Sequence, residues 1–194
     1  MNLFILDSNP YTAAESYQDL HVNKIICEGS QMLANCYTLE RLAQPDVPLT
    51  QKGTARVHSY QKHPMALWIR ANIRNFAWTL QHLTALCSEY TYRFKKEHFN
   101  DKHYTEAFIR WCNETSPTEV LIKEYDKCSL TEWPQCFGQY PQCIVPGDPV
   151  AGYRNYYNTA KSVFIVRGKP VYATWTRRPV PAWFNLINSN HGSV

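Results

Sequence analysis

The sequence has few glycines, little charge and no long apolar run. Only 7 of its 194 residues are glycine, and the patterns GxxxxGK[ST], GxGxxG and GxSxG are all missing. ATP-driven kinases, dinucleotide oxidoreductases and ordinary esterases therefore lose support. No stretch approaches the roughly 18 apolar residues needed to span a bilayer. We expect no membrane association.

The sequence also lacks the cysteine and histidine patterns of disulfide frameworks and metal sites. Its 7 cysteines form an odd set with no CxxC pair, and Cys128, Cys136 and Cys143 are spaced more loosely than zinc-ribbon ligands. No HxH, HxxxH or HExxH pattern occurs. The first residues lack the basic region of a signal peptide. We therefore expect a cytoplasmic protein with free thiols and no transition-metal site.

What the sequence does have is a surplus of aromatic residues. Aromatics make up 14% of the chain, with 13 Tyr, 8 Phe and 6 Trp. This composition argues against a disordered chain. The net charge of +4 is compatible with nucleic acid or nucleotides but does not select them. The length of 194 residues predicts one domain covering residues 1–194.

The spacing of apolar residues predicts a mainly α-helical domain around one long central helix. That helix is expected at 64–96, begun by Pro64, because an apolar stripe runs from Ile69 to Phe94 at spacings of four and three. Cap-and-proline pairs at 9–10 and 148–149 predict a helical region over 10–43 with a break near 19–21, and a helix over 149–164. Shorter helices are expected near 102–112 and 116–125.

The remaining segments predict irregular structure. Prolines and glycines in 128–148 indicate an ordered loop. Residues 167–170 predict a turn before a short strand at 171–175, so the domain has at most a small strand pair. Residues 176–194 are expected to form an extended, Pro-rich C-terminal arm. Residues 3–6 fit either a buried strand or an extended lead-in.

One helical face carries every common type of proton-transfer side chain. His21, Lys24, Glu28 and Gln31 follow at spacings of three, four and three, so they project from one side of a helix. Glu28 could act as a general base, Lys24 as a charge clamp or imine-forming amine, and His21 as an acid or phosphate contact. The alternative is the solvated side of an amphipathic helix.

A second group of residues is suited to phosphate. Arg70 and Arg74 are one turn apart in the expected central helix, and His63 precedes the first turn of that helix, where free backbone N–H groups bind anions. The alternative is an ordinary basic helix surface.

A third group mixes aromatic and basic residues near the C-terminus. Such alternation is suited to stacking on bases and pairing with phosphates. The alternative is that these rings cover the central helix. The candidate residues are Arg154, Tyr156, Trp175, Arg177 and Arg178.

Taken together, these motifs resemble a family of small proteins encoded by tailed bacteriophages, the amino acid:DNA transferases of thymidine hypermodification. The likeness spans nearly the whole chain. Its residues are Leu6-Asp7-x-x-Pro10-x-x-Ala13-Ala14, Asp19-x-His21-Val22-x-Lys24, Glu28-x-x-Gln31-Met32-Leu33, His63-Pro64 with Trp68, Asn75 and Trp78, Ala85-Leu86-Cys87-x-Glu89-Tyr90-x-x-Arg93 with Lys96, and Asp148-Pro149-x-x-x-Tyr153-Arg154-x-Tyr156-Tyr157.

The resemblance implies an enzyme of the infected host cytoplasm that acts on DNA or a nucleotide. Enzymes of this family replace the pyrophosphate on an activated 5-hydroxymethyluracil base with an amino acid such as glycine. A divalent cation could accompany the leaving pyrophosphate. The expected pyrophosphate-binding residues are Arg70, Arg74 and Arg154; the expected bases are Glu28 or His21; the expected base-holding rings are Tyr156 or Trp175.

Two other functions use the same residues. A DNA glycosylase or lyase could act through Lys24 or Glu28 on a modified base. A non-enzymatic phage protein could instead bind a nucleotide or a host defence factor through the polar face at 21–31. The sequence does not fix the oligomeric state.

Overall fold

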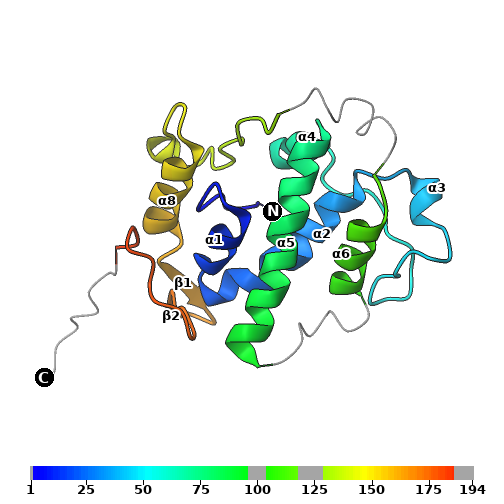
Figure 1. Cartoon of the computed structure of the whole chain (residues 1–194). Helices are drawn as coiled ribbons and strands as arrows, with labels where there is room; N and C mark the ends of the chain where they lie inside the picture. Colours follow the sequence, from blue (N-terminus) through cyan, green and yellow to red (C-terminus); the bar gives the residue numbers. More distant parts are fainter. Residues whose placement is uncertain (1, 96–103, 118–128, 186–194) are drawn as a thin grey trace, which may run out of the picture.

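The protein has a mainly α-helical fold with one two-stranded antiparallel sheet in the described part of the chain (Figure 1). The computed structural model describes residues 2–95, 104–117 and 129–185. Within them, α5 contacts α1, α2, α4 and α6. The elements are α1 Pro10–Glu15, α2 Asp19–Ala34, α3 Leu39–Leu42, α4 Pro64–Ile69, α5 Ile73–Phe94, α6 Thr105–Glu114, η1 Pro141–Cys143, α8 Pro149–Ala160, β1 Val163–Val166 and β2 Lys169–Tyr172.

The expected helix over 64–96 is two helices, so that prediction was wrong at its N-terminal end. Chain direction changes at Asn72, whose side chain accepts hydrogen bonds from the backbone N–H groups of Arg74 and Asn75. Asn75 in turn donates its side-chain amide to the Trp68 carbonyl at 2.8 Å. The apolar stripe continues across the break, which is why periodicity alone did not reveal it.

Helices α2 and α5 approach closely at Gly29. Gly29 lies against Leu83, and a Cβ at position 29 would collide with the Leu83 side chain. Apolar side chains of both helices are buried here, including Ile25, Ile26 and Leu86. The missing side chain at Gly29 therefore sets how closely α5 packs on α2.

The N-terminal segment lies inside this core as an extended lead-in without a strand. Leu3, Ile5 and Leu6 are 0% exposed. Because Phe4 pairs with no neighbouring strand, its backbone N–H and C=O both bond the Tyr17 hydroxyl, at 2.8 Å each. The expected helix break falls at 16–18, between α1 and α2.

The predicted cap at Asp148 is confirmed, but the helix it begins is shorter than expected. Asp148 accepts from the Ala151 N–H, and α8 ends at Ala160. The next residues leave the helix because Val163–Val166 pairs with Lys169–Tyr172 around a turn at Gly168, which has φ +77°. Between 129 and 148 the chain is irregular apart from η1, as predicted.

The described part of the predicted Pro-rich arm, 176–185, contains no helix or strand, and together with residues 173–175 it packs on the domain. Trp175 and Phe184 are both 7% exposed, and the Trp175 indole N–H donates to the Ser16 carbonyl at 3.0 Å. Asp19 also accepts hydrogen bonds from Thr176. Aromatic burial thus outweighs the absence of regular structure in this Pro-rich segment.

Several expectations concern residues outside the described ranges. They include most of the expected helix at 116–125, residues 186–194 of the arm, Lys96 and Cys128. The six cysteines that are described are free thiols. In the described ranges no helix is both long and apolar enough to cross a membrane.

Candidate active site between α2 and α8

Lys24 and Glu28 form an open ion pair on the polar side of α2. Lys24 Nζ lies 3.8 Å from Glu28 Oε1, and the side chains are 60% and 20% exposed, respectively. The other carboxylate oxygen, Oε2, accepts the Asn2 backbone N–H at 3.1 Å. Glu28 is therefore held from below by the N-terminal segment, while its pairing with Lys24 is loose.

His21 does not share the exposure of Lys24, so its expected place on the open polar face was wrong. It is 2% exposed, stacks on Phe4 with ring centroids 4.6 Å apart, and has Nδ1 2.6 Å from the Tyr157 hydroxyl. Burial, reinforced by the positive charges of Lys161 and Lys24, lowers the pKa of His21 to about 3. The imidazole is thus neutral near pH 7 and lies beneath the site.

Two groups within electrostatic range of Lys24 and Glu28 are Tyr156 of α8 and Lys161, which follows the last residue of that helix. Lys161 Nζ lies 5.1 Å from the centroid of the Tyr156 ring. Burial lowers the pKa of Lys161, and the Glu28 carboxylate opposes that shift; burial raises the pKa of Tyr156, and Lys24 opposes it. Each pair thus lies within electrostatic range across the two helices. We call Lys24, Glu28, Tyr156 and Lys161 the α2–α8 cluster.

Phe4 joins the two sides of this cluster from below. Its ring contacts His21 of α2 and, at a centroid distance of 6.1 Å, Tyr156 of α8. It also meets Tyr157 edge-on at 5.2 Å. A rigid aromatic floor therefore fixes the spacing of the charged groups above it.

His63 lies at the edge of the cluster. It caps α4, with Nδ1 accepting the Met65 N–H at 3.2 Å. Burial lowers the pKa of His63, and the Glu28 carboxylate opposes that shift. His63 is thus near enough to Glu28 for their charges to interact, although its ring already has a capping role.

The arginines of the second predicted group do not form the expected pair on one helix face. Arg70 ends α4 and donates from Nη2 to the Gln61 carbonyl at 2.7 Å. Arg74 is exposed in the first turn of α5, beyond the break at Asn72. The break removes the i, i+4 relation on which the prediction depended.

The third predicted group is divided in the same way, because only Tyr156 lies in the α2–α8 cluster. Arg154 donates to the Leu6 carbonyl at 2.9 Å and pairs with Asp7 at 3.2 Å. Arg177 donates to the Tyr92 carbonyl at 2.8 Å, and Trp175 is buried.

Arg178 belongs to a separate, buried charge cluster around Arg93. The Arg93 side chain is 0% exposed, with Nε 2.6 Å from Glu89 and Nη1 3.0 Å from Asp19. Arg178 Nη2 lies 2.8 Å from the other Glu89 oxygen. Arg93 also donates to the carbonyls of Tyr17 and Glu15. We call Asp19, Glu89, Arg93 and Arg178 the Arg93 cluster.

Two parts of the site were not among the candidate site residues. Lys161 accompanies the Tyr-rich stretch at 153–157 in the third predicted group, but it follows the last residue of α8 and so falls on no helical stripe. Phe4 resembles any apolar core residue. Among the residues that the structure describes, no three His, Cys, Asp or Glu side chains are grouped to hold a metal ion.

Comparison with known proteins does not assign this site. No family model, curated protein or solved structure matches the chain.

Proposed function

We propose that the protein is a DNA base-modifying transferase that attaches an amino acid to an activated 5-hydroxymethyluracil base. The observation that carries the proposal is the α2–α8 cluster itself. A partly exposed carboxylate, two lysines and an aromatic ring lie within interaction range on a rigid floor. Such a set serves base stacking, anion neutralisation and proton removal together.

In this reaction the amino group of the amino acid attacks the methylene carbon on the base. A carbon–nitrogen bond forms, the bond from carbon to the pyrophosphate oxygen breaks, and pyrophosphate leaves with the electron pair. Glu28 accepts the proton lost by the amine. Lys24 and Lys161 stabilise the negative charge that grows on the leaving group.

The remaining groups position the substrate. The Tyr156 ring offers a stacking surface for the extruded base, and the Lys161 ammonium above that ring adds a cation–π contact.

Mass spectrometry tests the reaction directly. DNA whose 5-hydroxymethyluracil bases carry pyrophosphate is incubated with the protein and glycine, with and without magnesium, and then digested to nucleosides. We expect a new nucleoside whose mass follows an isotope label placed in the glycine. Absence of label from the nucleosides, with glycine or any other common amino acid as the labelled donor, would overturn the proposal.

One observation favours a second candidate, a DNA glycosylase with lyase activity. Burial lowers the pKa of Lys161, which raises the fraction of neutral amine available to attack a sugar C1′. The bond from C1′ to the base would break with its electron pair on the base, and an imine to the opened sugar would remain.

Borohydride separates the two candidates because it reduces that imine to a stable protein–DNA adduct. An adduct that is lost in Lys161→Met but kept in the control Lys169→Met, an exposed residue of β2, would favour the lyase. Recovery of unchanged DNA in both assays, with saturable binding, would identify a binding protein instead.

A further inference from the structure

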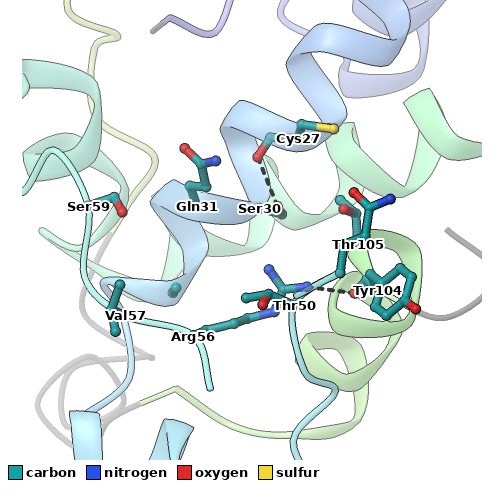
Figure 2. Close-up of a pocket in the computed structure, with 11 residues that line it drawn as sticks. Cys27, Ser30, Gln31, Thr50, Arg56, Val57, Ser59, Tyr104 and Thr105 are labelled. Carbon is teal, nitrogen blue, oxygen red and sulfur yellow. Dashed lines mark hydrogen bonds between the residues drawn. The ribbon is translucent and has the colours of Figure 1, made fainter. Parts of the chain in front are cut away.

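A pocket lies on a different side of α2 from the α2–α8 cluster, between that helix, the loop at 50–59 and the start of α6. It has a volume of about 330 Å³. Figure 2 shows Cys27, Ser30 and Gln31 of α2 across the pocket from Arg56, Tyr104 and Thr105. None of the α2–α8 cluster residues lines it.

Arg56 gives this pocket a positive charge that is largely removed from solvent. The residue is 8% exposed, and its guanidinium stacks on the Phe108 ring at 4.1 Å. Burial lowers its pKa to about 10, so the group stays protonated near pH 7. A buried guanidinium normally has a carboxylate partner.

In the described part of the chain, Arg56 has no such partner. Nε donates to the Pro48 carbonyl at 3.3 Å and Nη2 to the Tyr104 carbonyl at 2.6 Å, while no described residue accepts a hydrogen bond from Nη1. Nη1 is also not fully enclosed by the described residues. Two nitrogens thus brace the loop, and the third is left with donors for a ligand.

The start of α6 adds a second feature that favours negative charge. Tyr104 precedes the first turn of α6 and makes no capping bond with its side chain. Thr105, the first helical residue, lines the pocket. The positive end of the helix dipole therefore lies next to Arg56.

The other lining residues are neutral. They supply hydroxyl and amide groups together with small apolar surfaces. Among the described residues, those that line the pocket beside Arg56 include no aspartate or glutamate: Cys27, Ser30, Gln31, Ala34, Thr50, Gln51, Val57, Ser59, Tyr104 and Thr105. A ligand with negative charge would meet no repulsion from them.

We propose that this pocket binds a small organic oxyanion, a phosphate monoester or a carboxylate, anchored by Arg56 Nη1 beside the start of α6. The volume is suited to a compact molecule, at the lower end of the range of small-molecule sites. The proposal does not depend on the transferase reaction, and it can be tested without DNA.

Calorimetric titration tests the site with two simple probes, inorganic phosphate and acetate, at constant ionic strength maintained with chloride. We expect saturable binding of one equivalent per chain. Saturation by phosphate indicates a phosphate monoester as the natural ligand, and saturation by acetate alone indicates a carboxylate. Absence of saturable binding for both probes would overturn the proposal.

Two variants locate the binding. Arg56→Gln should abolish it, but this change also removes bonds to Pro48 and Tyr104 and could unfold the loop. Gln31→Glu avoids that problem, because it adds one negative charge to the lining at an exposed position with little change of shape. We expect Gln31→Glu to weaken binding by about tenfold or more.

The matched control is Gln81→Glu, which adds the same charge at an exposed position of α5 outside this pocket. Its affinity should stay within about twofold of the unmodified protein, because exposed charges are strongly screened. Equal affinity in Gln31→Glu and Gln81→Glu would place the bound anion elsewhere and contradict the proposal.

Discussion

The α2–α8 cluster and the Arg93 cluster contain similar charges in opposite environments. In the Arg93 cluster the central guanidinium is fully buried, and its contacts to Glu89 and Asp19 are 2.6 and 3.0 Å. In the α2–α8 cluster, Lys24 and Glu28 are 3.8 Å apart, and Lys24 is mostly exposed.

The comparison indicates that the charges of the Arg93 cluster stabilise the fold, whereas those of the α2–α8 cluster are accessible to a substrate. Arg93 connects α5 to the chain between α1 and α2, and Arg178 joins the C-terminal segment to the same carboxylate. Glu28 has one firm bond, to Asn2, and a loose pair with Lys24. Substitutions in the two clusters should therefore have different effects on stability and activity.

The largest loss of stability is expected for Arg93→Met. The change leaves Glu89 and Asp19 without their buried partner, which should lower the free energy of unfolding by about 3–5 kcal/mol. Urea unfolding followed by circular dichroism measures it. A loss no greater than that of Lys24→Met would show that the buried cluster does not hold the fold.

Arg178→Met should have an intermediate effect. Glu89 keeps Arg93 as a partner but loses the contacts with Arg178, at 2.8 Å to Oε2 and 2.9 Å to Oε1. We expect a loss of about 1–3 kcal/mol and faster proteolysis near 173–185. Unchanged protease sensitivity would argue against this attachment of the C-terminal segment.

Acid should destabilise the protein through two buried histidines, one of which lies under the α2–α8 cluster. Burial lowers the pKa of His21 to about 3 and that of His82 to about 4. Both are neutral in the folded state and become protonated in the unfolded state below about pH 6.5. Stability is therefore full above that pH and falls as the pH decreases toward 4.

Each histidine should contribute a slope of up to about 1.4 kcal/mol per pH unit over that window. Unfolding titrations at pH 7, 6 and 5 measure the slope, and His82→Gln should reduce it. A slope that is the same in His82→Gln and the unmodified protein would contradict the buried, neutral state of this ring.

The smallest effect on stability is expected for Lys24→Met. Its ion pair is loose and exposed, so the free energy of unfolding should change by less than about 1 kcal/mol. Under the proposed reaction, transfer activity should nevertheless fall, because one of the two charges proposed to neutralise the leaving group is lost. Full activity would remove Lys24 from the site.

Local signals in the sequence predicted much of the fold. The caps at Asn9 and Asp148 act over three residues, so they are readable without knowledge of the tertiary structure. The break at Asn72 has the same type of cap, but the apolar stripe that continues across it pointed to one helix. The packing of 173–185 depends on contacts with Ser16, Asp19 and Glu89, which are distant in sequence.

Only part of the candidate site was predictable from the sequence. Helical spacing identified Lys24 and Glu28, because both are on one element. It could not identify Lys161 or Arg56, whose environments are created by tertiary contacts with Tyr156 and Phe108. It also could not show that the arginines at 154, 177 and 178 have partners within the fold.

The most direct test of the division between the two clusters is the labelled-glycine assay on Glu28→Gln. We expect this variant to unfold within about 1 kcal/mol of the unmodified protein. Incorporation of label into nucleosides should fall by about 10²–10⁴-fold, because the variant lacks the base proposed to remove the amine proton. Incorporation at the rate of the unmodified protein would contradict the assignment of the α2–α8 cluster as the active site.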